Sequence, residues 1–170
     1  IKQNLFADLE NYCREDTIFA TNTSVMSITE IAQKSKKKDR IVGAHFWNPP
    51  FLIPLVEVVK AEETSDETMK ITMDLLSKVG KKPIWVNKDV PGFVANRLQH
   101  ALWREAISIV ERGIADPATV DDALKFGPGL RLPQLAPIEN ADMVGLDLTL
   151  SIHSYILKYL EDSHEPSPLL

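Results

Sequence analysis

The chain is poor in the residues that mark several classes of protein. It has a single cysteine, Cys13, among 170 residues, so it can form neither an internal disulfide framework nor a cysteine-based metal site. No hydrophobic run approaches the roughly 20 residues of a membrane-spanning helix, and the N-terminus lacks a signal-peptide pattern. We therefore expect a soluble protein of the cytoplasm or of an organelle matrix, with no membrane partner and no bound metal.

The chain also lacks an excess of positive charge. It has 19 basic and 24 acidic residues, a formal net charge of -5, and one dense basic run, from Lys34 to Arg40. That run lies between an expected helix and an expected strand, as a solvated loop does, whereas nucleic-acid-binding domains carry a larger basic surface. We expect no nucleic-acid partner. With 44% hydrophobic residues, the chain should bury at least one globular core.

The first half of the chain alternates between helical and strand patterns. This alternation predicts an α/β layer architecture. The predicted strands are Thr17–Asn22, Ile41–Phe46, Leu55–Ala61 and Lys82–Asn87. A helix capped by Ser65 or Asp66 is expected to run through Val79, before the last of these strands.

The second half of the chain is helical throughout. A long helix is expected from Pro91 to a stop at Gly113, followed by a shorter one with Asp116 as its cap. A last helical region runs from about Ile138 to Glu161. We place the domain boundary near Asp89, so that residues 1–89 form an α/β domain and residues 90–170 a helical domain.

Two polar residues, His45 and Glu57, stand in strands that are otherwise apolar. In the segment "LVEVV" alternate side chains take opposite faces, and both faces are apolar, so Glu57 should be desolvated. A buried carboxylate requires a partner. That partner is either a lysine or arginine in a structural ion pair, or the imidazole of His45 on the neighbouring strand. In the second case Glu57 fixes the tautomer of His45 and favours its imidazolium form.

Short polar side chains lie at the ends of three separate elements. His45 lies at the end of one predicted strand, the segment "TNTS" from Thr21 to Ser24 comes after the apolar part of another, which ends at Ala20, and Asn96 adds an amide from the first turns of the long helix. In doubly wound α/β sheets, ligands bind at the carboxyl ends of the strands. Convergence of such groups from separate elements is typical of a site rather than of a core.

Four motifs give the chain a family resemblance. They are "FATNTSVMSITEIA", "GAHFWNPPFLIPLVEVVKA", "KDVPGFVANRLQ" and "FGPG", in this order, and the resemblance that they carry covers essentially the whole chain. Together they resemble the 3-hydroxyacyl-CoA dehydrogenase family. The resemblance implies an α/β fold: residues 1–89 would be the C-terminal part of a Rossmann-type NAD-binding domain. Residues 90–170 would be an all-α, 6-phosphogluconate-dehydrogenase-like helical domain that forms a homodimer.

The resemblance also implies roles for the polar residues. His45 matches the general base of the family, Glu57 its partner, Ser24 a hydrogen-bond donor to the substrate oxygen, and Asn96 a substrate-positioning amide. The implied reaction is the NAD-dependent oxidation of an (S)-3-hydroxyacyl-CoA to a 3-oxoacyl-CoA, with an acyl-CoA as substrate.

A second group of residues matches the cofactor contacts of the family. Lys2 corresponds to a lysine that contacts NAD, although an exposed helix lysine with no such role fits the pattern equally well. Asn22, with Ser24, lies where the nicotinamide would sit. No G-x-G-x-x-G occurs in the chain, so the glycine turn that holds the pyrophosphate is absent from it.

Some features depart from the family pattern and leave alternatives open. A helix is already in progress at Ile1, and the family continues past this C-terminus, so we expect a fragment truncated at both ends and inactive by itself. The segments "NPPFLIPLVEVV" and "VANRLQ" also resemble L-gulonate dehydrogenases. The alternatives are therefore a dehydrogenase of the same fold for a sugar acid or a carnitine-like alcohol, and a non-catalytic, crystallin-like dimerisation fragment.

Overall fold

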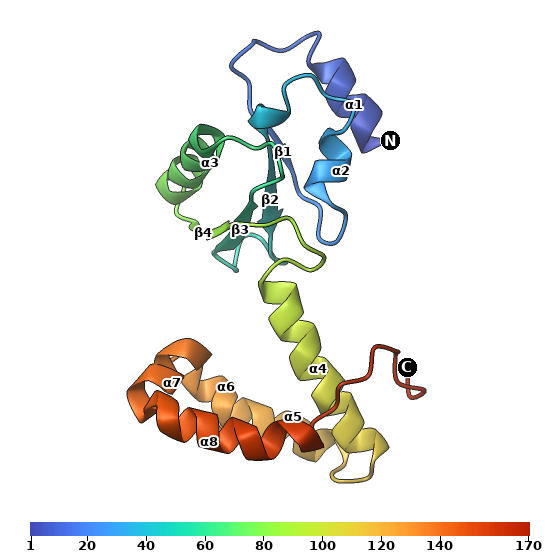
Figure 1. Cartoon of the computed structure of the whole chain (residues 1–170), viewed down its shortest axis with the longest axis vertical. Coiled ribbons are helices and arrows are strands. Elements are labelled where there is room, and N and C mark those ends of the chain that lie inside the picture. The colour runs from blue at the N-terminus through green and yellow to red at the C-terminus, as the bar shows by residue number, and fades with distance from the viewer. The chain divides into compact units, whose positions relative to one another are not determined.

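A four-stranded sheet organises the first part of the computed structural model, which describes residues 1–170 (Figure 1). The strands are β1 (Phe19–Thr21), β2 (Ile41–Phe46), β3 (Leu55–Val59) and β4 (Lys82–Val86), in the order β1-β2-β3-β4. β1 is parallel to β2 and β3 is parallel to β4, whereas β2 and β3 are antiparallel. The connection at residues 47–54 contains no helix and is too short for a parallel crossover, which needs a dozen or more residues.

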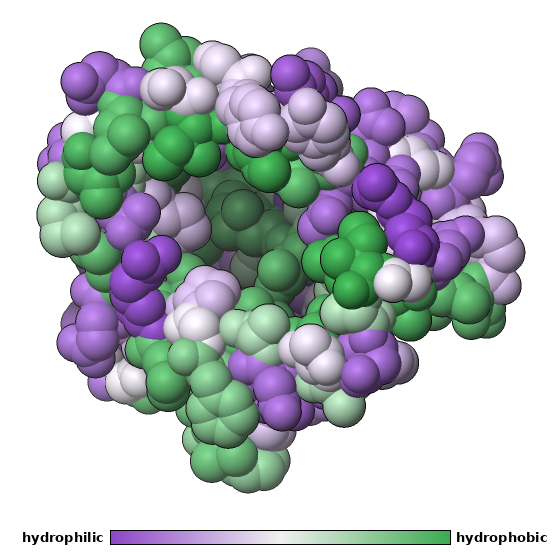
Figure 2. All heavy atoms as spheres, turned by 90° about the horizontal axis from the view of Figure 1, so that it is seen from below, coloured by the Kyte–Doolittle hydropathy of each residue, from purple (hydrophilic) through white to green (hydrophobic).

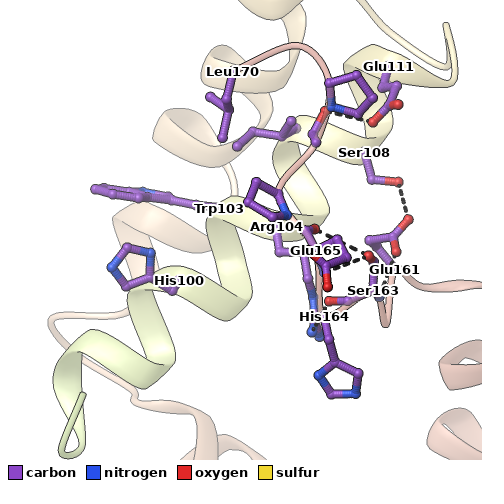
Figure 3. A pocket seen from close by; sticks show the side chains of 14 residues that line it. His100, Trp103, Arg104, Ser108, Glu111, Glu161, Ser163, His164, Glu165 and Leu170 are labelled. Atoms are coloured by element: carbon purple, nitrogen blue, oxygen red, sulfur yellow. Dashed lines mark hydrogen bonds between the residues drawn. The ribbon is translucent and has the colours of Figure 1, made fainter. Parts of the chain in front are cut away.

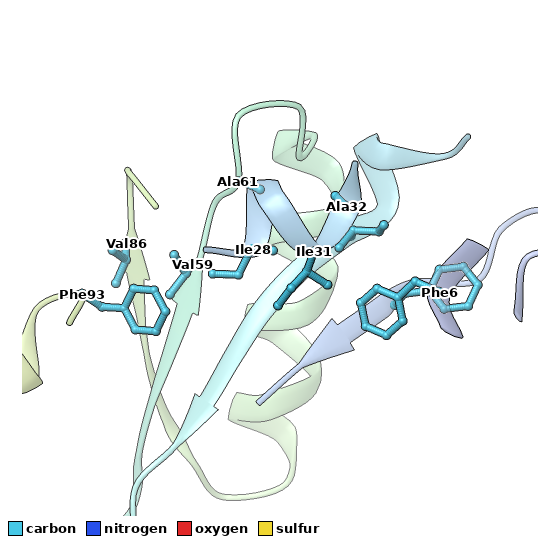
Figure 4. Packing of buried hydrophobic residues seen from close by; sticks show 10 residues of the cluster. Phe6, Ile28, Ile31, Ala32, Val59, Ala61, Val86 and Phe93 are labelled. Atoms are coloured by element: carbon cyan, nitrogen blue, oxygen red, sulfur yellow. The ribbon is translucent and has the colours of Figure 1, made fainter. Parts of the chain in front are cut away.

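Helices cover both faces of this sheet. Helices α1 (Lys2–Leu9) and α2 (Ile28–Ala32) lie on one face, and α3 (Asp66–Lys78) lies on the other. Figure 4 shows the core under α1 and α2, which buries Phe6, Phe19, Ile28, Ile31, Ala32, Ile41, Val59, Ala61, Val86 and Phe93. The core under α3 buries Val42, Ala44, Val56, Val58, Met69 and Leu76. The predicted α/β layers are therefore present.

Gly43 allows α2 to pack closely on β2. A Cβ atom at this position would lie 3.0 Å from Cδ1 of Ile28 and 3.0 Å from Cβ of Val59. Such distances are too short for ordinary carbon contacts, so a larger residue would force the helix away from the sheet. This close packing covers the sheet face on which His45 and Glu57 lie.

The long helix α4 (Ala95–Glu111) begins later than its predicted start at Pro91. Gly92 and Phe93 have positive φ angles of 76° and 47°, which a right-handed helix does not contain. The ring of Phe93 instead enters the core beside the sheet and is only 2% exposed. The first compact unit extends to Leu98 and so includes the first turn of α4.

The second compact unit, residues Gln99–Leu170, is all helical. After α4 come α5 (Pro117–Phe126), α6 (Pro128–Arg131), α7 (Pro137–Val144) and α8 (Leu146–Ile156). Asp116 caps α5 as predicted, because Oδ1 of Asp116 accepts the Thr119 N–H at 2.9 Å. The predicted region Ile138–Glu161 is interrupted by Gly145, whose φ of 97° ends α7.

The helical unit buries very little of its own side-chain surface. Ser108 is the single buried residue between Gln99 and Leu170, and α5 to α8 contain none. Figure 2 shows hydrophobic residues in green at the molecular surface, several of them around a hollow. No helix of the structure has both the length and the apolar character that crossing a membrane requires.

Candidate active site

A hydrogen bond between His45 and Glu57 lies at the centre of the candidate site. The antiparallel register of β2 and β3 sets His45 directly opposite Glu57. Nδ1 of His45 lies 2.8 Å from Oε2 of Glu57, and the two residues are 6% and 0% exposed. One of the two partners that the sequence left open for Glu57, the imidazole of His45, is thus present. The alternative partner is not, because Glu57 forms no ion pair with a lysine or an arginine.

Glu57 accepts four hydrogen bonds from three parts of the chain. Besides His45, the indole Nε1 of Trp47 donates to Oε2 at 3.2 Å. The backbone N–H groups of Val94 and Ala95 donate to Oε1 at 3.0 and 2.9 Å. A carboxylate offers about four lone-pair sites, so its acceptor capacity is filled. The two backbone donors stand at the start of α4, where the helix dipole also favours a negative charge.

This environment keeps Glu57 ionised although it is buried. Burial raises the pKa of Glu57, but hydrogen bonds from Ala95 N–H, His45, Trp47 and Val94 N–H together outweigh burial and hold that pKa below its ordinary value of 4.5. An ionised carboxylate only accepts hydrogen bonds, so the shared proton lies on Nδ1 of His45. In the neutral imidazole, Nε2 then carries the lone pair that can take a proton.

Two aromatic rings hold the plane of the His45 ring. Trp47 and Phe93 pack edge to face against it, with ring centroids 6.0 and 5.7 Å away. Nε2 of His45 makes no hydrogen bond in the chain, and it is not among the buried polar atoms that lack a partner. This nitrogen is therefore accessible from solvent and open to a substrate hydroxyl.

Ser24 and Asn96 lie against each other beside this pair. Nδ2 of Asn96 donates to the backbone carbonyl of Ser24 at 3.5 Å, the long limit of a hydrogen bond. Asn96 directly follows Ala95, whose N–H binds Glu57, so the same turn of α4 contacts both Glu57 and Ser24. The hydroxyl of Ser24 is exposed and makes no hydrogen bond in the chain. Both side chains thus have free polar atoms.

Lys2 and Asn22 lie at the carboxyl ends of β1 and β2. Nζ of Lys2 donates to Oγ1 of Thr21 at 3.2 Å, which brings α1 to the end of β1. Oδ1 of Asn22 accepts the Phe46 N–H at 2.8 Å and so ties the ends of the two strands together next to His45. A continuous set of contacts and neighbouring residues therefore links all six residues singled out from the sequence.

Sequence reasoning missed three contributors to this site: the indole of Trp47, the ring of Phe93, and the N–H pair of Val94 and Ala95. Trp47 had a usable signal, because it follows His45 by two positions and so continues the same face of the strand. The glycine at position 92 was a signal for a left-handed turn before the helix. Neither signal indicates that both features converge on Glu57.

A further pocket lies elsewhere, within the helical unit. It has a volume of about 820 Å³ and is bounded by α4 and the segment from Glu161 to Leu170 (Figure 3). Two serine–glutamate hydrogen bonds cross its wall: Ser108 to Glu161 at 3.1 Å and Ser167 to Glu111 at 2.7 Å. None of the six residues predicted from the sequence lines it.

Comparison with known proteins decides the family. Residues 1–90 match the family model of the 3-hydroxyacyl-CoA dehydrogenase NAD binding domain, and residues 92–170 match that of the C-terminal domain. The chain belongs to the 3-hydroxyacyl-CoA dehydrogenase family. Its NAD-binding domain is accordingly followed by a helical C-terminal domain, as the resemblance implied.

Individual members of the family match the chain along its whole length. A probable 3-hydroxybutyryl-CoA dehydrogenase of Bacillus subtilis is 41% identical over 99% of this chain and 58% of its own length. The mitochondrial hydroxyacyl-coenzyme A dehydrogenase of Homo sapiens is 40% identical over 100% of this chain and 54% of its own. The chain thus spans a little over half the length of these curated relatives.

A solved structure of the family is also very similar. The NAD+-dependent 5-formyl-3-hydroxy-2-methylpyridine 4-carboxylic acid 5-dehydrogenase superposes with a TM-score of 0.94 at 36% identity, covering 99% of this chain and 54% of that one. An (S)-3-hydroxybutyryl-CoA dehydrogenase of Ralstonia eutropha superposes with a TM-score of 0.71 at 35% identity. This match covers 90% of this chain and 53% of that one.

The substitution Glu57→Gln is expected to lower the free energy of unfolding at neutral pH by about 2–4 kcal/mol, because the amide presents N–H to a site whose neighbours all donate. The pKa of Glu57 is lowered in the fold, so its charge stabilises the protein above the ordinary value of 4.5 and this contribution disappears as the pH falls through the lowered pKa. The difference between the two proteins should therefore shrink in acid. Urea unfolding across this pH range measures it.

The matched control is Glu63→Gln. Glu63 pairs with Lys38 at 2.9 Å on the surface, with 60% of the glutamate side chain exposed. Such a pair contributes less than about 1 kcal/mol, and the control should fall within that limit. Equal losses of unfolding free energy in the two variants would show that the charge of Glu57 stabilises the protein no more than a surface charge does.

Proposed function

We propose that this chain carries the acid–base residues of an NAD-dependent dehydrogenase that oxidises the 3-hydroxyl of an (S)-3-hydroxyacyl-CoA. The observation that carries the proposal is the 2.8 Å contact between buried Glu57 and Nδ1 of His45, with Nε2 left open, in a member of the 3-hydroxyacyl-CoA dehydrogenase family. The acyl-CoA substrate rests on what the similar proteins are named for.

In the proposed reaction His45 is the general base. Nε2 accepts the proton of the substrate hydroxyl as the carbonyl forms, and the proton on Nδ1 stays in its bond to Glu57. The imidazolium that results is stabilised by the ionised carboxylate at 2.8 Å. Acid–base help of this kind contributes about 10²–10⁴-fold to a rate.

Ser24 and Asn96 are proposed to position the substrate oxygen. The Ser24 hydroxyl is exposed and unbonded, and the long 3.5 Å contact of Asn96 leaves its second N–H and its Oδ1 free. Both can therefore hold a hydroxyl or carbonyl oxygen near His45 without breaking a strong existing bond. Positioning of this kind raises the rate by lowering the entropy lost on reaching the transition state.

The residues at the strand ends fit the nicotinamide end of NAD. Nδ2 of Asn22 makes no hydrogen bond in the chain, and Lys2 is held by Thr21 at the same edge of the sheet. We infer that Lys2, Asn22 and Ser24 contact the cofactor, an amide and a hydroxyl being suited to its carboxamide and ribose. When bound, NAD+ supplies the hydride acceptor.

A second candidate substrate is a small aromatic aldehyde acid rather than an acyl-CoA. The observation that favours it is the TM-score of 0.94 with a dehydrogenase named for 5-formyl-3-hydroxy-2-methylpyridine 4-carboxylic acid. With an aldehyde, water would first add to the carbonyl to give a hydrate, and Nε2 of His45 would then take a hydroxyl proton of that hydrate as hydride leaves the same carbon for NAD+ and the carboxylic acid forms. Measuring NADH formation by the whole protein with 3-hydroxybutyryl-CoA and with the pyridine aldehyde acid, side by side, separates the two candidates.

The substitution His45→Gln is expected to lower kcat by at least about 10²-fold in the whole protein, because glutamine cannot take the hydroxyl proton. KM should change little, since the loss lies in the chemical step. Steady-state NADH formation measures both constants. The control is His164→Gln, an exposed histidine of the C-terminal segment, which should retain wild-type kcat. A His45→Gln enzyme within twofold of wild type would contradict the proposed base, and an inactive wild type would favour a non-catalytic fragment.

We also propose that the helical unit forms a homodimer. Its helices α5 to α8 bury no side chain of their own, and α8 leaves Leu146, Leu148, Leu150 and Ile152 at least half exposed. Exposed hydrophobic surface on this scale marks an interface rather than a free surface. A second copy of the same helices is the partner that the resemblance implies.

The double substitution Leu146→Glu with Leu150→Glu is expected to convert a micromolar dimer into a monomer. The two leucines are each 69% exposed and lie one turn apart on α8, so the variant places two charges on one face. Light scattering after size exclusion measures the mass. Leu75→Glu on α3, where the leucine is 60% exposed, is the control and should leave the dimer intact. A monomeric wild type would refute the dimer.

A further inference from the structure

We propose that Trp47 is a positioning residue whose indole N–H sets how strongly Glu57 acts on His45. The inference rests on the proposed function of that pair. The inference goes beyond the proposed function because it assigns a role to Trp47, which follows β2 and which the proposed reaction does not otherwise use.

Trp47 and His45 share one carboxylate oxygen. Nε1 of Trp47 donates to Oε2 of Glu57 at 3.2 Å, and Nδ1 of His45 donates to the same atom at 2.8 Å. Oε1 is occupied by the N–H groups of Val94 and Ala95, so no other acceptor on Glu57 is free for the indole. Two donors on one oxygen divide its negative charge, and each weakens the bond of the other.

The indole also restricts the geometry of the pair. Its ring packs against the His45 ring at an interplanar angle of 61°, with centroids 6.0 Å apart. Because Trp47 touches both partners, it fixes the Glu57 carboxylate and the His45 ring relative to each other. A phenylalanine would keep an aromatic face at this position but would lack the N–H.

No other charged side chain competes for this role. From β2 and β3, the titratable groups of the cluster are His45 and Glu57 themselves. Lys81, next to β4, lies over the Phe46 ring and donates to the carbonyl of Ile53, and Arg97 of α4 donates to that of Pro91. The effect of removing the indole N–H should therefore be transmitted through Glu57 alone.

Removal of the N–H should shift the pH profile of alcohol oxidation in a defined direction. Oε2 becomes the stronger acceptor for His45, which favours the imidazolium, so the acidic limb of kcat/KM should move to higher pH by about half a unit. Loss of the N–H also frees the Glu57 carboxylate from one of its four donors, so kcat should fall roughly three- to tenfold through poorer positioning of His45, with KM nearly unchanged. Glu57→Gln should move the same limb to lower pH, because it removes the charge itself.

The experiment compares Trp47→Phe with Trp85→Phe in the whole protein. Trp85 lies on β4 and packs on the core under α3, so the same atoms are deleted without a Glu57 contact. A second variant, Trp47→3-benzothienylalanine, keeps both rings and replaces only the N–H by sulfur. Profiles of kcat/KM against pH and melting temperatures are measured for all three.

A shift to higher pH in both position-47 variants, absent in Trp85→Phe, is the expected result. A lower melting temperature with an unmoved acidic limb would overturn the proposal and leave Trp47 as a packing residue. An equal shift of the limb in Trp85→Phe would overturn it as well, because that variant removes no donor from Glu57.

A nuclear magnetic resonance measurement keeps this test separate from the proposed function. The chain has three tryptophans, so Trp47→Phe identifies one of three indole N–H signals. In Glu57→Gln that signal should move upfield as its bond to a charged oxygen is lost. An unmoved signal would overturn the positioning role. A moved signal in a protein without dehydrogenase activity would support the Trp47 contact and reject the proposed reaction.

Discussion

The arrangement of the candidate site depends on one buried carboxylate. Glu57 is fully buried in the centre of a sheet, where an unpaired charge would cost several kcal/mol even after relaxation. The fold satisfies it with four donors instead of a single counter-ion. These donors come from β2, from the residue after its end and from the start of α4, so one side chain fixes the mutual positions of three segments.

Strand pairing decides what this carboxylate can do. In the antiparallel register His45 lies directly across from Glu57, and the short Cβ distance of such a pair lets the two side chains meet. A slip of one residue would turn one of them to the opposite face, against α3. On the same face of the sheet, Gly43 pairs with Val59 two residues away and lets Ile28 of α2 pack closely on this pair. Core packing and site geometry are thus determined together.

Sequence reasoning identified the parts of this site that follow from local periodicity. Alternation in "LVEVV" predicted that Glu57 is buried and needs a partner, with His45 as one of two alternatives, and the structure contains the His45 contact. The start of α4 could not be read in the same way. Pro91 is a good first-turn residue, but Gly92 and Phe93 adopt left-handed angles, and the N–H groups that follow them bind a carboxylate 37 and 38 positions away. That long-range contact is invisible in the local sequence.

The two halves of the chain differ in how far they bury their hydrophobic side chains. The α/β unit closes two cores, one on each face of its sheet, whereas the helical unit closes none. Yet α4 belongs to both units: its first turn is bound to Glu57, and its later turns lie in the helical unit. A single helix therefore binds the buried carboxylate at its N-terminus and supplies the first residues of the helical unit.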